Sequence, residues 1–335
     1  MEHRPTMRAL SALCLFALTL GAASCQSTTR SSNKPSALDE TLASTGDEIV
    51  VCGKRFSTGG APVVLWSERG GFNAYSTLNH FKNTEPKSGK RYTPGRSRKL
   101  DGDRRESLIR ANERDPLKLA QVVDQFVLHY DVCGVSERCF MVLHDDRELS
   151  VHFLLDVDGT IYQTMDVRDQ AWHSGKANSR SVGVEIAQIG AYPTGSTSTL
   201  ERWYENDAKG PYVSLQMLEG WNVRTPGFIA RPREASLQKG MIHGTEYAQY
   251  DFTPQQYESL AKLTATLARA LPGLEIDAPR DAQGEVRTDV LSPEEYDRFR
   301  GVLGHYHVTT AKQDPGPAFD WERFLAETRR EAARP

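Results

Sequence analysis

Three strand-like segments follow one another in the middle of the chain, and they constrain its fold more than any other feature. VVDQFVLHY (122–130) is rich in β-branched and aromatic residues, which favour strands. LSVHFLLDVDGTIYQ (149–163) has two apolar runs around an Asp-Gly pair, which predicts a hairpin. In SVGVEIAQ (181–188) the apolar residues alternate, so Glu185 faces away from its valines. We therefore expect a sheet here.

Helix signals come later in the chain. Thr253 is suited to be an N-cap, with Pro254 at the first helical position and Gln256 completing a capping box. An apolar stripe follows until a Pro-Gly pair stops the helix. Further helices are expected over about 293–301 and 320–332. Strands followed by helices indicate an α/β or α+β fold with a central sheet.

The N-terminus has the pattern of an export signal. Residues 1–24 carry arginines, then an apolar run too short to span a membrane comfortably, then small residues. Cys25 follows directly, as in bacterial lipoprotein signals whose cysteine is lipidated; ordinary cleavage nearby is the alternative. Residues 25–47 suit a flexible linker. We expect a protein of the bacterial cell envelope, either membrane-anchored on the periplasmic side or secreted.

The rest of the chain divides by composition. The net charge of −3 gives no case for nucleic-acid binding. Residues 48–115 form an N-terminal extension of unknown role, whose basic stretch suits a solvated loop. Residues 116–335 form the main domain, interrupted at 191–250 by an insertion rich in Gly, Pro, Ser and Thr. We expect a monomer.

If the protein is exported, its cysteines lie in an oxidising compartment where disulfides can form. Cys52, Cys133 and Cys139 remain after the signal and Cys25. Cys133 and Cys139 are close enough in sequence for a local disulfide in an oxidising compartment. Alternatively, all three are small buried hydrophobic residues.

Five residues offer the chemistry of a zinc hydrolase. Two histidines and an aspartate, His129 at the end of a strand with His305 and Asp314 near the C-terminus, suit a catalytic zinc that keeps one position open. Glu185, the lone acid of an apolar strand, suits proton transfer, and Lys312 suits stabilisation of an oxyanion. Each residue alone is more often structural, so the combination carries the hypothesis.

The order of the blocks resembles a known family. The blocks are FVLHY, SVHFLLDVDGTIYQ, AWHSGKANSRSVGVEI, YDFTPQQYESLAKL and GHYHVTTAKQDPGPAFDW. They are similar to those of the zinc-dependent N-acetylmuramoyl-L-alanine amidases of the second type, which share a fold with peptidoglycan-recognition proteins. The resemblance covers about 116–333 except the insertion. It implies a central mixed β-sheet flanked by helices, in an amidase catalytic domain.

The resemblance also implies roles for individual residues. Zn²⁺ would be held by His129, His305 and Asp314, with Glu185 as the general base and Lys312 stabilising the tetrahedral intermediate.

Other assignments in the last block and around it follow from the same resemblance. His173 and Asn178 would lie at the substrate groove, and the pairing of Cys133 with Cys139 gains support. His307 stays an alternative zinc ligand to His305, although Gly304 before His305 favours the latter.

These observations predict an exported zinc amidase. It would hydrolyse the amide bond between N-acetylmuramic acid and L-alanine in peptidoglycan or muropeptides, with a lipid anchor in the membrane. The alternative is a non-catalytic peptidoglycan-binding receptor of the same fold; such proteins typically lose a zinc ligand, and here all three are present. An unrelated zinc peptidase fits less well because the chain lacks a His-Glu-x-x-His motif.

Overall fold

The computed structural model describes residues 45–99 and 106–334. The expected signal (1–24), the lipidation candidate Cys25 and most of the expected linker (25–47) lie outside the described residues, so these expectations stay predictions. Among the described residues, no helix is long and apolar enough to cross a membrane.

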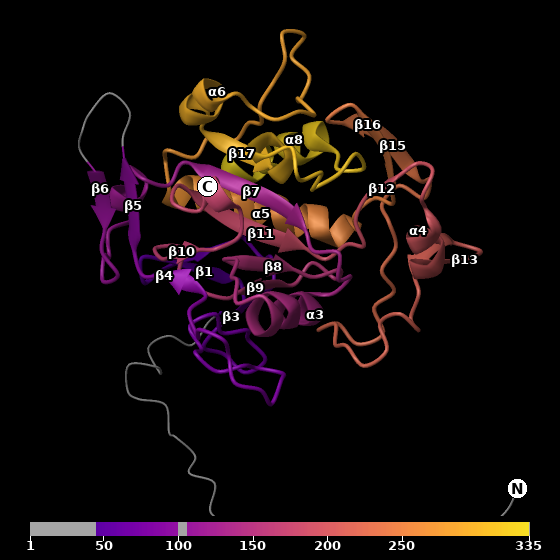
Figure 1. Ribbon diagram of the computed structural model, residues 1–335, viewed down its shortest axis with the longest axis horizontal. Helices are drawn as coiled ribbons and strands as arrows, with labels where there is room; N and C mark the ends of the chain where they lie inside the picture. Colours follow the sequence, from indigo (N-terminus) through magenta and orange to yellow (C-terminus); the bar gives the residue numbers. More distant parts are fainter. Residues whose placement is uncertain (1–44, 100–105, 335) are drawn as a thin grey trace, which may run out of the picture. The chain divides into compact units, whose positions relative to one another are not determined.

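A six-stranded mixed sheet forms the centre of the fold (Figure 1). Its strands, in spatial order, are β17 (Gly301–Gly304), β7 (Gln125–Tyr130), β11 (Ser181–Ile186), β8 (Phe153–Leu155), β9 (Ile161–Gln163) and β3 (Val63–Leu65). The first four are parallel to one another, β8 and β9 form the expected antiparallel hairpin, and β3 runs parallel to β9. The predicted strands and the mixed sheet are confirmed, although the strands are shorter than the sequence segments.

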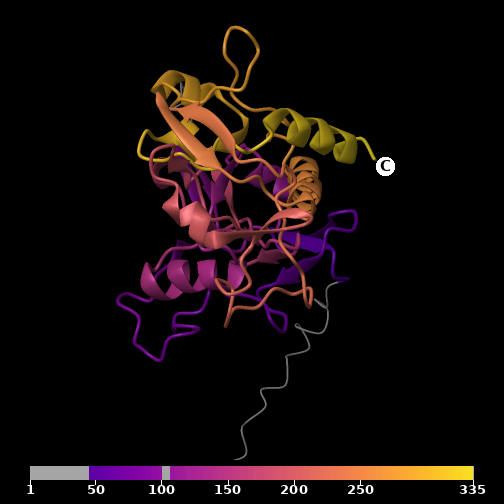
Figure 2. The ribbon, with the colours of Figure 1, turned by 90° about the vertical axis from the view of Figure 1, so that its right-hand side faces the viewer.

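Helices cover both faces of this sheet (Figures 1 and 2). On one face lie α5 (Pro254–Ala270) and α8 (Trp321–Ala332), which pack against each other and share a core with the apolar side chains of β7, β8 and β11. The predicted capping box is present. The Thr253 hydroxyl accepts a hydrogen bond from the Gln256 N–H, and the Gln256 side-chain oxygen accepts one from the Thr253 N–H. On the other face lies α3 (Ser136–Phe140), continued by the π-helical turn η1 (Met141–Asp146).

The N-terminal extension is folded onto the main domain. Its β3 lies at the edge of the central sheet, and its other strands make the pairs β1 (Glu48–Val51) with β2 (Lys54–Ser57), β4 (Tyr92–Thr93) with β10 (Gln170–Ala171), and β5 (Arg96–Lys99) with β6 (Glu106–Ile109). The described residues belong to one compact unit.

The insertion has secondary structure of its own. It contains β12 (Tyr192–Pro193), α4 (Ser198–Trp203), β13 (Tyr204–Asp207), β14 (Gly210–Val213), β15 (Gln238–Ile242) and β16 (Thr245–Gln249). Gln249 donates to the Pro315 carbonyl and accepts from the Ala318 N–H, so β16 supports the loop before α8. The insertion therefore reaches the segment that carries the C-terminal candidate residues.

Four short helical segments complete the fold: α2 (Pro116–Leu119), η2 (Gly175–Ala177), α6 (Pro293–Arg298) and α7 (His305–Val308). The predicted helix after Ser292 is confirmed as α6, with a capping box between Ser292 and Glu295. By contrast, α7 lies outside the segments in which the sequence predicts helices.

Candidate active site

Three adjacent parallel strands deliver the candidate residues to one edge of the sheet. Glu185 of β11 lies directly opposite His129 of β7, and both side chains point to the face that α3 covers. On the other side of β7, β17 ends at Gly304, and His305 begins α7 at once. The carboxyl ends of parallel strands are the usual place for active sites in open α/β sheets. Asp314 comes from the loop after α7, which folds back so that the Tyr306 N–H donates to its carbonyl.

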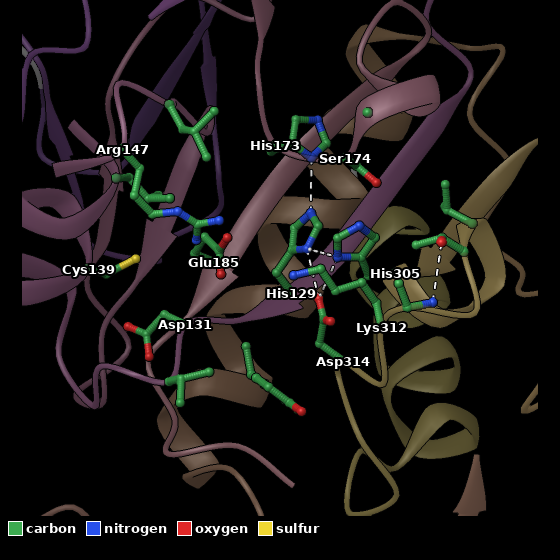
Figure 3. Close-up of a pocket in the computed structure, with 18 of the residues that line it drawn as sticks. His129, Asp131, Cys139, Arg147, His173, Ser174, Glu185, His305, Lys312 and Asp314 are labelled. Carbon is green, nitrogen blue, oxygen red and sulfur yellow. Dashed lines mark hydrogen bonds and ion pairs between the residues drawn. The ribbon is translucent and has the colours of Figure 1, made fainter. Parts of the chain in front are cut away.

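His129, His305 and Asp314 converge on one point (Figure 3). The two Nδ1 atoms lie 3.0 Å apart, and Asp314 Oδ2 is 2.8 Å from His129 Nδ1 and 3.0 Å from His305 Nδ1. All three residues are buried, and they line a cleft of about 820 Å³. Ligand atoms of tetrahedral zinc lie roughly 3.3 Å apart, so the spacing of these atoms suits one ion.

His173 determines which ring nitrogen of His129 carries the hydrogen. Ser181 Oγ donates to the Ala177 carbonyl, so the hydroxyl oxygen accepts from His173 Nε2–H at 3.2 Å. His173 Nδ1 is then the acceptor for His129 Nε2–H, 3.0 Å away. His129 Nδ1 consequently presents a lone pair to the Asp314 carboxylate oxygen. Two such acceptors at 2.8 Å repel each other unless a cation lies between them, which favours a metal.

The position of His173 depends on a glycine. A Cβ on Gly183 of β11 would lie 2.5 Å from His173 Nδ1, so any side chain there would displace the imidazole. His173 also lines the cleft, as the sequence predicted. Its ring nitrogens, however, contact His129 and Ser181, which makes it a positioning residue for His129.

The electrostatics of the cluster suit metal binding. Burial, and then the neighbouring His305, lower the pKa of His129 to about 4, so the imidazole is neutral near pH 7. Burial alone would raise the pKa of Asp314, but His305 and His129 outweigh it and hold that pKa below its ordinary value. Neutral imidazole and ionised carboxylate are the forms that bind metal.

Glu185 and Lys312 both line the cleft beside this cluster (Figure 3). Burial, and then the Asp314 carboxylate, raise the pKa of Glu185 well above its ordinary value. A carboxylate with a raised pKa is a stronger base, which suits it to take up and return a proton. The main chain of Lys312 is held by the insertion, because His243 Nε2–H donates to its carbonyl at 3.1 Å.

His307 is not part of the cluster, which answers the question that the sequence left open. Its Nδ1 accepts from the Gly304 N–H at 2.9 Å, and its Nε2–H donates to the Arg287 carbonyl at 2.8 Å. The side chain is fully buried, and both nitrogens are used by the backbone. His307 therefore stabilises the turn that presents His305.

Two other sequence assignments concern residues beside the cluster. Asn178 does not line the cleft; its Oδ1 accepts from the His173 and Ser174 N–H groups and so shapes the loop that carries His173. Cys133 and Cys139 are buried free thiols in contact with each other, and both line the cleft. Their pairing stays a prediction.

Sequence reasoning missed two arginines near the site. Arg96 of the extension is buried and donates to the Ser181, Val167 and Asp169 carbonyls, so it braces the strand and loop around His173. Arg147 lines the cleft beside Glu185 (Figure 3). Arg96 lies in a basic stretch and Arg147 in the run HDDRE, and both stretches look like solvated surface; neither had a signal that would single it out.

Comparisons with known proteins place the chain in a family. The family described as N-acetylmuramoyl-L-alanine amidase (Amidase_2) matches residues 119–317, more than half of the chain. The 1,6-anhydro-N-acetylmuramyl-L-alanine amidase AmpD of Salmonella typhimurium is 29% identical over 108 residues, which are 32% of this chain and 44% of AmpD. The chain thus matches less than half the length of this curated relative.

The chain also resembles solved structures, with low TM-scores. A selenomethionine AmpD derivative has a TM-score of 0.31 at 17% identity, covering 62% of this chain and 86% of that one. AmiD of E. coli, in complex with the substrate anhydro-N-acetylmuramic acid-L-Ala-D-gamma-Glu-L-Lys, has a TM-score of 0.32 at 18% identity, covering 61% and 57%. From the match over residues 119–317, we conclude that this chain belongs to the N-acetylmuramoyl-L-alanine amidase family Amidase_2.

Proposed function

We propose that this protein is a zinc-dependent amidase that hydrolyses the bond between the lactyl group of N-acetylmuramic acid and the L-alanine of a peptidoglycan stem peptide. The convergence of His129, His305 and Asp314 within 3.0 Å, next to Glu185 in one cleft, carries this proposal. Membership of the amidase family supports the choice of bond. The printed name of the relative AmpD, a 1,6-anhydro-N-acetylmuramyl-L-alanine amidase, supports a muropeptide substrate.

The residues of the cleft have different roles in hydrolysis. When bound by His129, His305 and Asp314, zinc polarises a carbonyl and lowers the pKa of water. Glu185 takes a proton from the attacking water and delivers it to the leaving nitrogen of L-alanine, so that a carboxylate and a free amine result. The Lys312 ammonium stabilises the negative charge that develops on the carbonyl oxygen. His173 keeps His129 in the tautomer that leaves Nδ1 free.

Mass spectrometry of digested cell-wall fragments tests this function. The zinc-loaded protein should release stem peptides with a free N-terminal L-alanine, and neither Glu185→Ala nor chelated wild-type protein should do so. Parallel digests of intact sacculi, muropeptides and anhydro-muropeptides would show which substrate size is preferred. Binding of these fragments without any release by the zinc-loaded protein would contradict the proposal and favour a receptor.

We also propose that the protein is exported to the cell envelope and held at the membrane by a lipid on Cys25. The order of residues 1–25 supports this, since positive charge, an apolar run and small residues precede the cysteine. Cys25→Ser should move the full-length protein from the membrane fraction to the soluble fraction of cells. An unchanged distribution would contradict lipid anchoring at this residue.

A further inference from the structure

A second cavity, of about 380 Å³, lies on the other side of α3 from the cleft. We call it the arginine pocket, and its main lining residues are Arg69, Phe72, His80, Glu137, Tyr162 and Arg224. Within α3, Glu137 lines the arginine pocket and Cys139 lines the cleft. Residues two positions apart in a helix, such as these two, point in directions roughly 200° apart around the helix axis. The two cavities therefore open on nearly opposite sides of one helix.

The floor of the arginine pocket is aromatic. Phe72 and Tyr162 are buried, with ring centroids 4.6 Å apart, and Phe72 also stacks on Phe140 of α3 at 5.1 Å. The stacking fixes the floor to α3 and the sheet. Pockets with an apolar floor and a few polar groups at the rim are typical of small-ligand sites, and the volume lies in their usual range.

Two positive charges of the pocket lack a negative partner. Arg69 and Arg224 are exposed, and neither guanidinium forms an ion pair or hydrogen bond with any residue in the described part of the chain. Glu137, the acid of the pocket, accepts hydrogen bonds from the N–H and side-chain amide of Asn222 and forms no ion pair with either arginine, so the pocket keeps a net positive charge. Guanidinium groups bind carboxylates in a planar, two-point geometry, so an anionic ligand would complete this site.

Both arginines lie in loops that hydrogen bonds hold in place. Arg224 lies between Asn222, bound to Glu137, and Thr225, whose N–H donates to Asp158 Oδ2 at 2.9 Å. Arg69 lies in a turn closed by the Gly71 N–H and the Glu68 carbonyl at 3.0 Å. A Cβ on Gly71 would lie 2.0 Å from the Leu65 carbonyl oxygen, so the turn depends on glycine. Pre-organised walls reduce the entropy cost of binding.

Part of the arginine pocket lies outside the family match, and part lies in the segment that the sequence predicts to be an insertion. Arg69 and Phe72 belong to the N-terminal extension, outside residues 119–317 that match the family, and Arg224 belongs to the insertion 191–250. Two segments far apart in sequence thus bring one arginine each to the same aromatic floor.

We propose that the arginine pocket is a second binding site for peptidoglycan, which recognises a carboxylate of the polymer while the cleft holds the bond to be cut. This inference rests on the proposed amidase function. Peptidoglycan offers two sources of carboxylate. One is the stem peptide, and the other is the lactyl group of N-acetylmuramic acid, whose carboxylate hydrolysis of the amide sets free.

A binding experiment tests this site without any turnover. The double variant Arg69→Gln/Arg224→Gln, made in a Glu185→Ala background, is compared with Arg110→Gln/Arg114→Gln in the same background. The control removes the same charge from two exposed arginines that line neither cavity. Co-sedimentation is measured with intact sacculi and with glycan strands already stripped of their peptides. We expect the dissociation constant of the pocket variant to rise roughly tenfold on at least one polymer.

The two polymers identify the source of the carboxylate. Weaker binding to sacculi alone assigns the pocket to stem-peptide carboxylates, and weaker binding to stripped strands assigns it to lactyl carboxylates. Binding of both polymers as tight as that of the control variant would overturn the proposal. The proposed function is checked separately, by peptide release from a single-disaccharide muropeptide with the wild-type protein, so that a failure of either proposal is recognised on its own.

Discussion

The cleft and the arginine pocket lie on two sides of one helix. The charged groups of the cleft contact one another, whereas the two arginines of the arginine pocket have no acidic partner within the described residues. In the cleft, buried His129, His305 and Asp314 lie within 3.0 Å of one another, and the protein itself supplies every group that a metal needs. In the arginine pocket, Arg69 and Arg224 are exposed and have no acidic partner within the described residues. Under our two proposals, the first cavity activates a bound group and the second recognises one, because a partner for the charge of the second cavity must come from outside the protein.

The largest effect should come from the metal cluster. Asp314→Ala removes the one anionic ligand, so we expect the affinity for zinc to fall more than about a hundredfold, beyond the loss typical of residues that only orient a ligand. Peptide release should fall below detection. Chelator competition and metal analysis measure the loss relative to the wild type. Equal zinc content in Asp314→Ala and wild type would remove Asp314 from the site.

The next effect separates catalysis from metal binding within the cleft. Glu185→Gln keeps the size of the side chain but removes the base, so we expect kcat to fall by about 10²–10⁴ with zinc content unchanged. Since burial raises the pKa of Glu185, kcat/KM of the wild type should fall as the pH drops through a midpoint above 4.5. Steady-state kinetics on a soluble muropeptide from pH 4 upward would measure both. Near-normal turnover of Glu185→Gln would contradict its role as base.

A smaller effect is expected from the histidine behind the cluster. His173→Ala removes the acceptor for His129 Nε2–H, and losses of this kind lower metal affinity about 10–100-fold. Gly183→Ala should act in the same direction, because its methyl group displaces the same imidazole. Zinc titration of both variants measures the effect. Wild-type affinity in both would show that His173 serves the substrate, as the sequence resemblance implied, and not the metal.

The sequence predicted the strands and helices around the cleft well, for physical reasons that are local. The capping box at Thr253 and the alternation around Glu185 are patterns within a few residues. The ligand set came from the order of the blocks in the resemblance. By contrast, the choice between His305 and His307 as ligand could not be made from local sequence, because it depends on a hydrogen bond from His307 to the Arg287 carbonyl.

The arginine pocket and the role of Arg96 could not be predicted. Arg69 and Arg224 are separated by much of the chain and meet because the extension and the insertion fold onto the same helix. Arg96 reaches backbone carbonyls more than 70 residues away, and nothing in its own neighbourhood shows that it is buried. Tertiary contacts of this kind leave no pattern in one sequence.

The smallest effect concerns the stability of the turn that presents His305. Burial lowers the pKa of His307 to about 3, whereas the unfolded chain titrates this histidine near pH 6.5. Its contribution to stability is therefore complete above pH 6.5 and is lost as the pH falls toward 3. His307→Gln should lower the melting temperature at pH 7 and reduce its dependence on pH in this window. The same slope in variant and wild type would show that His307 does not titrate in this way.

The most direct test of the metal site is a crystal structure of the zinc-loaded protein with anomalous data collected at the zinc edge. We predict one strong peak, about 2.0–2.2 Å from His129 Nδ1, His305 Nδ1 and Asp314 Oδ2, on the wall of the cleft that Glu185 lines. A peak elsewhere, or none at these three atoms, would contradict the account.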